Sequence, residues 1–226
     1  MTRFQRVFVW SGGALFVASL IVCAWWYLID LRDPRPWRGW SPLAFDVALF
    51  GVFALHHSAF AREPIKRRLT AIPAALRRSV YVWVASILLL VVCLRWQTIG
   101  GDLYAVGGVG AVALVGAQVT GIWLIARSVA RIDPLELAGI RASTSTPSLQ
   151  IEGPYRFVRH PLYLGWMFVV FGAPHMTGDR LAFAAISSIY LLVAVTWEER
   201  SLMLSFGDDY ARYAREVRWR VIPFVY

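Results

Sequence analysis

Six long apolar stretches constrain this chain more than any other feature. They cover residues 7–29, 43–61, 79–96, 104–126, 158–175 and 181–197. At 1.5 Å of rise per residue, a helix of about 20 residues crosses roughly 30 Å of hydrocarbon. Composition agrees, because 58% of the 226 residues are hydrophobic and 16% are charged, against roughly 25% charged in soluble domains. The sequence therefore predicts an all-α integral membrane bundle of five to six transmembrane helices.

The last two apolar stretches are short and are joined by residues 176–180. They predict a tight helical hairpin that does not have to cross the whole bilayer. Pro174 is expected to bend or end the fifth helix, since proline cannot continue a helical ladder. The first stretch is too long for a cleavable signal peptide, so we expect it to remain as a span.

Basic residues are distributed unevenly between the connecting segments. If the N-terminus is cytoplasmic, 18 of the 23 Lys and Arg fall on the inner side. This asymmetry follows the positive-inside rule and places both termini in the cytoplasm. The net charge of +9 then reports topology and contact with anionic lipid rather than binding of nucleic acid.

Two polar islands stand out against this apolar background. Gly153–Gly165 carries two arginines, a histidine and two tyrosines, and Glu198–Arg200 follows one hairpin later. Pro161 suits the first position of a helix, where its missing N–H costs nothing. Both islands are predicted at the cytoplasmic face, where they would meet. Interfacial anchoring of the first island and a solvated helix end for the second are the plainer alternatives.

The glutamate pair is predicted to close the sixth span. Carboxylates at a helix C-terminus are disfavoured by the helix dipole, so Glu198 and Glu199 require a compensating cation. The arginines of the first island or a cationic ligand could supply it. Apolar and aromatic residues recur at spacings of three and four over residues 202–217, which predicts an amphipathic cytoplasmic helix on the membrane surface.

Other motifs carry weaker signals. Gly108–Ala113 has the dinucleotide pattern G-x-G-x-x-A, but it lies in a transmembrane run, where small residues favour close helix packing. Cys23 and Cys93 lie in apolar runs and define no metal site. His56 and His57 stand near the inner end of the second span. A polar residue at that depth is a functional candidate, and an interfacial histidine with a backbone partner is the equal alternative.

The two islands together resemble a known family. R-H-P-x-Y-x-G at Arg159–Gly165 and E-E-x-x-L-x-x-x-F-G-x-x-Y-x-x-Y at Glu198–Tyr213 are similar to the membrane-embedded methyltransferases, which include isoprenylcysteine carboxyl methyltransferase and the phospholipid N-methyltransferases. The resemblance implies S-adenosyl-L-methionine as cofactor, bound at the cytoplasmic side without a Rossmann domain, and no metal. The cofactor residues that it implies are Ser148, Leu149, Gln150, Tyr155, Arg159, His160, Pro161, Leu162, Tyr163, Gly165 and Glu198.

Segments 55–62, 132–139 and 173–177 resemble the methanethiol S-methyltransferase branch. Members that methylate a prenylcysteine carboxylate carry an arginine about one turn before the glutamate pair, where this chain has Ala194. The resemblance therefore implies methyl transfer to a small apolar thiol, giving a thioether. His57, Tyr163 or Glu199 could handle the thiol proton, and Glu199 and His57 are taken as catalytic candidates.

This interpretation divides one membrane domain, residues 1–226, into an N-terminal four-helix part at 1–130 and a cofactor-binding catalytic part at 131–226. The cofactor pocket is expected to be cytoplasmic and to be roofed by the C-terminal helix. The expected partners are a small hydrophobic methyl acceptor and membrane lipid. A prenylcysteine carboxylate or a phospholipid amine is the alternative acceptor. A non-catalytic haem- or quinone-binding accessory of respiration is the alternative from another class.

Overall fold

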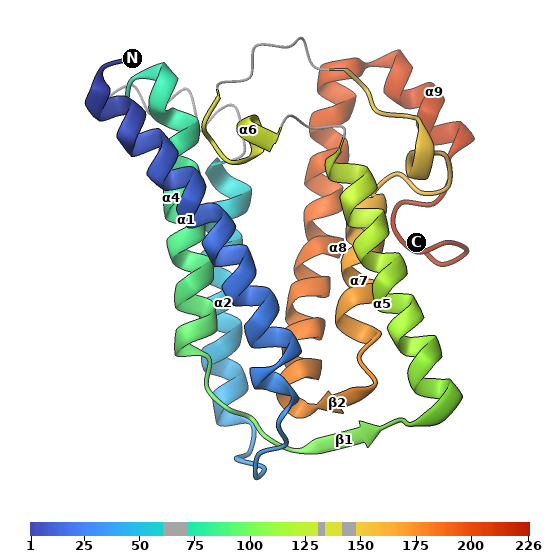
Figure 1. The fold of residues 1–226 in the computed structure, drawn as a ribbon. Helices are drawn as coiled ribbons and strands as arrows, with labels where there is room; N and C mark the ends of the chain where they lie inside the picture. Colours follow the sequence, from blue (N-terminus) through green and yellow to red (C-terminus); the bar gives the residue numbers. More distant parts are fainter. Residues whose placement is uncertain (61–71, 131–133, 142–147) are drawn as a thin grey trace. The chain divides into compact units, whose positions relative to one another are not determined.

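The computed structural model describes residues 1–60, 72–130, 134–141 and 148–226. Helices make up most of these residues (Figure 1). The longer helices are α1 (Arg3–Leu28), α2 (Ser41–Phe60), α4 (Ala74–Arg95), α5 (Gly108–Val129), α7 (Pro161–Phe171), α8 (Gly178–Phe206) and α9 (Asp208–Glu216). The short elements are α6 (Pro134–Leu137), the 3-10 turns η1 (Asp30–Arg32) and η2 (Gly153–Arg156), and the paired strands β1 (Asp102–Ala105) and β2 (His175–Thr177).

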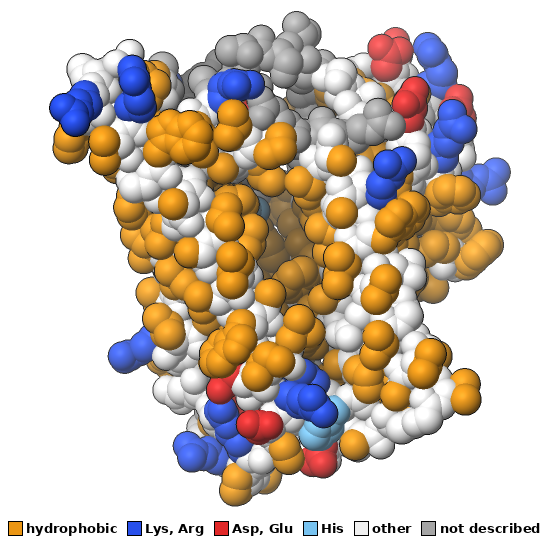
Figure 2. Space-filling view, in the orientation of Figure 1, with side chains coloured by type: hydrophobic (Ala, Val, Ile, Leu, Met, Phe, Trp, Pro, Cys, Tyr) orange, Lys and Arg blue, Asp and Glu red, His pale blue; other side chains and the backbone are white. Residues whose placement is uncertain are grey.

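Five of the described helices, α1, α2, α4, α5 and α8, are long and apolar enough to cross a membrane. The prediction of an all-α, multi-pass membrane protein is thus confirmed. In Figure 2 hydrophobic side chains run along the helices, and charged side chains gather toward the helix ends. The fifth apolar stretch forms only the 11-residue α7, which begins at Pro161 and ends before Pro174, as the prolines predict.

The predicted end of the sixth span is wrong. Helix α8 has 29 residues and continues to Phe206, so the glutamate pair lies inside the helix rather than at its C-terminus. The dipole argument for a compensating cation therefore does not apply. Gly207, with a φ of +51°, then separates α8 from α9. Glycine tolerates this left-handed conformation, so the predicted amphipathic stretch 202–217 is divided between two helices.

The described residues fall into two compact units. The first contains α1, α2, α4 and α6, together with Thr177–Asp179, where α8 begins. Helix α4 contacts both α1 and α2, and the Trp83 indole stacks on Phe8 and donates to its carbonyl oxygen at 3.0 Å. Asp179 is 2% exposed and accepts hydrogen bonds from the backbone N–H groups of Ile99 and Gly100. This carboxylate fixes the loop after α4.

The second unit contains α5, η2, α7, α9 and α8 from Arg180 onward. Helices α5 and α7 pack closely because glycines face each other where the helices meet. A Cβ atom on Gly121 would lie 2.5 Å from the carbonyl oxygen of Gly165, and one on Gly165 would lie 2.7 Å from that of Gly121. Small residues allow such close approach between membrane helices. The pair sets the position of α7, which begins at the first polar island.

A single methyl group should disturb this crossing. Replacing Gly121 by alanine is expected to lower the free energy of unfolding by about 1–3 kcal/mol, the usual cost of overpacking. Gly116→Ala is the matched control on the same helix, since a Cβ there meets nothing within 4 Å. Thermal unfolding of both variants in detergent measures the difference. Equal stability of the two variants would contradict the close crossing.

Candidate active site

The first polar island is held in place by the C-terminal segment. The backbone N–H groups of Arg159 and His160 donate to the carbonyl oxygens of Trp219 and Arg220, at 2.9 and 2.8 Å. Val221 is fully buried and packs with Met167 of α7 and Val195 of α8. The end of the chain thus ties the entrance of α7 to α8. Nothing in the local pattern of residues 218–226 predicted this role.

Glu199 lies between two arginines. Its Oε1 atom is 2.6 Å from Arg159 Nε, and its Oε2 atom is 2.9 Å from Arg220 Nε. The side chains of Arg159 and Glu199 are 8% and 12% exposed. Arg159 Nη1 also donates to the carbonyl oxygens of Val217 and Arg218. The two islands therefore meet, as the sequence predicted, through a buried ion pair.

Glu198 has different surroundings from its neighbour. Its side chain is 45% exposed, and its Oε2 atom accepts a 2.7 Å hydrogen bond from the Tyr163 hydroxyl. The His160 ring stacks on the Tyr163 ring, with centroids 5.5 Å apart. His160 Nδ1 lies 3.6 Å from Glu198, and Nε2 lies 3.4 Å from Glu199. One carboxylate thus remains accessible while the other is enclosed by cations.

A cavity of about 250 Å³ lies beside this group. Ten of the eleven cofactor residues implied by the sequence line it: Ser148, Leu149, Gln150, Tyr155, Arg159, His160, Pro161, Leu162, Tyr163 and Glu198. Gly165 is not among the lining residues, because it lies on the face of α7 that packs against α5. The cavity combines an accessible carboxylate with apolar and aromatic walls.

Four further lining residues, Leu202, Phe206, Tyr210 and Tyr213, were not among the predicted cofactor residues, although the C-terminal helix was expected to roof the pocket. They are the L, F, Y and Y of the second motif, and their helical spacing was interpreted as a membrane-facing surface. Tyr210 and Tyr213 are instead 3% and 6% exposed. The Tyr213 hydroxyl donates to the carbonyl oxygen of Tyr155 at 2.8 Å, which joins α9 to η2. Periodicity identified the buried face correctly but not what covers it.

Ionisation of the α9 phenols is suppressed. Burial raises the pKa of Tyr210 well above its usual value, and the negative charge of Glu199 adds to this effect. Burial also raises the pKa of Tyr213, against the opposing effect of Arg159. Both phenols are therefore neutral at physiological pH. The Tyr210 hydroxyl is buried beside Glu199.

Comparison with known proteins identifies the family. A sequence model of the phospholipid methyltransferase family matches residues 109–209. Methanethiol S-methyltransferase of Crocosphaera subtropica is 36% identical over 82% of this chain and 76% of its own length. The chain belongs to the methanethiol S-methyltransferase family. The Mycobacterium tuberculosis methanethiol S-methyltransferase is 37% identical over 76% of this chain and 75% of that protein.

Membership of the methanethiol S-methyltransferase family makes the protein a membrane methyltransferase that uses a methyl donor. The alternative from another class, a non-catalytic haem- or quinone-binding accessory, is therefore not favoured. Similarity also extends to nurim of Xenopus laevis, 29% identical over 66% of this chain and 58% of that protein. No solved structure matches the chain.

His57 belongs to the first unit, whereas the site residues described above belong to the second. Its Nδ1 atom lies 2.8 Å from the Tyr81 hydroxyl oxygen, within hydrogen-bonding distance, and its ring stacks on Phe53. These contacts connect α2 with α4. A catalytic role for His57 remains a prediction, as does the catalytic role of Glu199.

Proposed function

We propose that this protein transfers a methyl group from S-adenosyl-L-methionine to a small apolar thiol, giving a thioether. The observation that carries the proposal is the cavity in which Glu198 stands accessible among apolar and aromatic side chains. A cationic donor requires such a carboxylate, and an apolar acceptor requires such walls. The methanethiol S-methyltransferase names of the relatives favour the same acceptor class.

The chemistry of the lining residues fits the proposed donor. Glu198 can pair with a cationic group of the donor, and this carboxylate keeps one oxygen engaged by Tyr163. The rings of Tyr155, Phe206 and Tyr210 offer faces on which an adenine can stack. Bound there, S-adenosyl-L-methionine would supply an electrophilic methyl group.

The protein's own contribution is orientation and exclusion of water. Leu149, Leu162 and Leu202 line the cavity, and removal of water strengthens electrostatic interactions inside such a site. Holding donor and acceptor in line can supply as much as ~7–11 kcal/mol of the barrier reduction. The acceptor must lose its proton, because the thiolate is the nucleophile. Glu199 would have to release an arginine to accept that proton, whereas the Glu198–Tyr163 pair faces the cavity.

An acceptor panel tests the proposal. The purified protein in nanodiscs is incubated with methyl-labelled S-adenosyl-L-methionine and methanethiol, a prenylcysteine analogue or a phosphatidylethanolamine. We expect labelled thioether from the thiol and little transfer to the other two. Turnover should rise with pH until the bound thiol is fully ionised, since only the thiolate attacks. The neutral phenols of Tyr210 and Tyr213 should not limit this rise.

Two results would contradict the proposal. Methylation of the lipid amine or prenylcysteine without thioether would assign the cavity to another acceptor. If calorimetry in detergent and in nanodiscs shows no binding of S-adenosyl-L-methionine, the proposed methyl donor is wrong. Arg215→Gln on α9, an exposed residue that does not line the cavity, serves as the control for preparation quality.

We also propose that both termini and this cavity face the cytoplasm, because the basic residues follow the positive-inside rule. Cys23 and Cys93 are free and buried, so an introduced cysteine can be labelled selectively. Arg215→Cys should react with an impermeant maleimide from the cytoplasmic side, and Arg38→Cys from the opposite side. The reverse labelling pattern would show that the protein has the opposite orientation in the membrane.

A further inference from the structure

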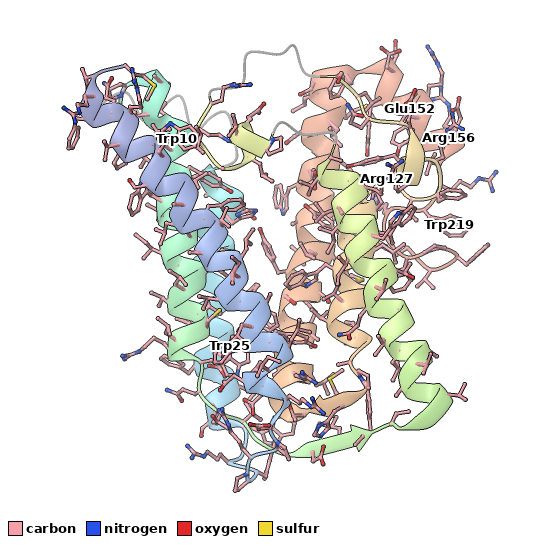
Figure 3. The ribbon with its side chains drawn as sticks, in the orientation of Figure 1. Trp10, Trp25, Arg127, Glu152, Arg156 and Trp219 are labelled. Atoms are coloured by element: carbon pink, nitrogen blue, oxygen red, sulfur yellow. The ribbon has the colours of Figure 1, made fainter. Side chains whose placement is uncertain are left out.

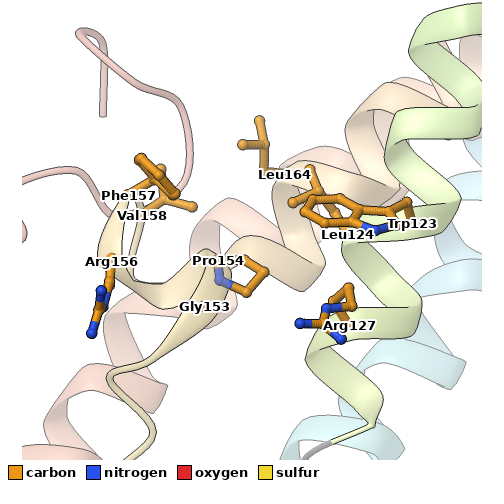
Figure 4. A pocket seen from close by; sticks show the side chains of 9 residues that line it. All are labelled: Trp123, Leu124, Arg127, Gly153, Pro154, Arg156, Phe157, Val158 and Leu164. Atoms are coloured by element: carbon orange, nitrogen blue, oxygen red, sulfur yellow. The ribbon is translucent and has the colours of Figure 1, made fainter.

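A second pocket, separate from the one proposed to bind the donor, lies between α5 and η2. It has a volume of about 360 Å³ and is lined by Trp123, Leu124, Arg127, Gly153, Pro154, Arg156, Phe157, Val158 and Leu164. We refer to it as the α5–η2 pocket. Figure 4 shows Arg127 and Arg156 on its two sides, with Pro154 between them and the large apolar side chains further from the end of α5. Nothing in the proposed methyl transfer uses this pocket.

Arg127 and Arg156 are the charged residues that line the α5–η2 pocket. Neither guanidinium group has a hydrogen bond or an ion pair with any residue that the structure describes. Arg159 and Arg220, by contrast, are both paired with Glu199. No acidic side chain among the described residues lines the pocket. Figure 3 shows Arg127 and Arg156 at the same end of the unit, near η2. The pocket is therefore bordered by one cation from α5 and one from η2.

An exposed apolar stripe leads along α5 to this pair of charges. Val112, Val119 and Trp123 are 72%, 59% and 55% exposed. Spacings of seven and four residues put them on one face of the helix, and Arg127 follows one turn later on the same face. Phe157 at the other wall is 75% exposed. In a helix long enough to span the bilayer, such a face contacts acyl chains.

We propose that the α5–η2 pocket binds an anionic phospholipid. The phosphate is held by Arg127 and Arg156, and an acyl chain lies on Trp123 and the α5 stripe. Arg127 stands in the last turn of α5, at the depth where a span meets the headgroups. Anionic lipids are concentrated in the cytoplasmic leaflet, the side on which the basic residues are predicted. A soluble anion would use the arginines but not the apolar walls, and an apolar partner helix would use the walls but not the arginines.

Lipid binding can be measured without any assay of methyl transfer. The full-length protein is purified in a neutral detergent and titrated with dioctanoyl phosphatidylglycerol or, as the zwitterionic comparison, dioctanoyl phosphatidylcholine. Retained lipid is counted by native mass spectrometry, and the melting temperature is followed in parallel. We expect one phosphatidylglycerol per chain, a rise in melting temperature with that lipid, and a much smaller rise with phosphatidylcholine.

The variants separate the pocket from general surface charge. Arg127→Gln and Arg156→Gln are each expected to weaken phosphatidylglycerol binding about tenfold, as for loss of one charge-assisted hydrogen bond. Arg215→Gln changes the net charge equally but lies outside the pocket, so it should bind like wild type. Trp123→Ala should weaken binding of the dioctanoyl lipid while leaving the preference for phosphatidylglycerol over phosphatidylcholine intact.

Several outcomes would overturn the proposal. If Arg215→Gln weakens phosphatidylglycerol binding as much as the pocket variants do, the lipid is attracted by general surface charge. An equal stabilisation by glycerol phosphate, which has no acyl chain, would make the site one for soluble anions. A dimer free of lipid in the mass spectrum would assign the apolar stripe to a second copy of the chain. If phosphatidylglycerol does not raise the melting temperature of the wild type, the pocket does not bind the proposed lipid.

Discussion

Replacing Glu198 by alanine is expected to weaken binding of S-adenosyl-L-methionine by about 10- to 100-fold, the usual range for loss of a charge-assisted contact. Glu198 is the accessible member of the glutamate pair, 45% exposed at the wall of the cavity. Its partner Tyr163 is a neutral donor, so the negative charge is not cancelled within the protein by that contact. A cationic group of the ligand can therefore pair with this negative charge.

Isothermal titration measures this effect, and two variants control for its cause. Glu198→Gln preserves the shape and the acceptor for Tyr163 but removes the charge, so it should lose nearly as much affinity as alanine. Glu216→Gln also removes one negative charge, but Glu216 is exposed at the end of α9 and should behave as wild type. Wild-type affinity in Glu198→Gln would show that charge at this position does not hold the donor.

Much of this site follows from sequence because its residues lie in two short segments. Arg159–Tyr163 supplies the charged turn and the start of α7, and Glu198–Tyr213 supplies helical repeats that face it. Pro161 at the first position of α7 is a local signal that needs no tertiary information. The same holds for the apolar spans, whose length is fixed by the bilayer.

The parts of the site that the sequence did not predict depend on contacts between residues distant in sequence. Arg220 and the C-terminal carbonyl of Tyr226, which accepts from the N–H groups of Arg220 and Val221, have no periodic pattern around them. Their importance appears only when the tail folds back onto α7. The end of α8 was misplaced for a related reason, since polar Glu198 and Glu199 look like the edge of a span until Arg159 and Arg220 are seen to compensate Glu199.

The α9 aromatics illustrate a limit of amphipathic patterns. The spacing of apolar residues along a helix locates its buried face but does not distinguish lipid from a cavity or a neighbouring helix. Tyr210 and Tyr213 face the cavity and η2. The motif spacing from Glu198 to Tyr213 was the signal that could have assigned them to the site, because it links α9 to the accessible carboxylate.

The second large effect is expected at Glu199. Removing its carboxylate in Glu199→Ala leaves Arg159 buried without its counter-charge, and breaking a buried ion pair in this way costs about 3–5 kcal/mol of unfolding free energy. Arg159 is 8% exposed, so water can replace little of the lost interaction. The variant should unfold at a markedly lower denaturant concentration in mixed micelles.

An exposed pair on α9 provides the control. Asp209 and Arg212 lie 3.7 Å apart with side chains 73% and 67% exposed, and surface pairs of this kind contribute little. Asp209→Ala should therefore unfold like wild type. Replacing both members of the buried contact, in Arg159→Met with Glu199→Met, should recover part of the stability lost in Glu199→Ala, because the buried charge is removed and the remaining cation, Arg220, is 38% exposed to water.

The same variants distinguish support of the fold from proton transfer at Glu199. If the residue holds the two islands together, Glu199→Gln loses stability, and the pH profile of its remaining turnover keeps the wild-type shape. A proton acceptor would give the opposite combination, with near-native stability and a profile that no longer rises as the wild type does. Unfolding curves and pH profiles of Glu199→Gln thus decide the role. The geometry favours support, because Arg159 and Arg220 already engage both carboxylate oxygens.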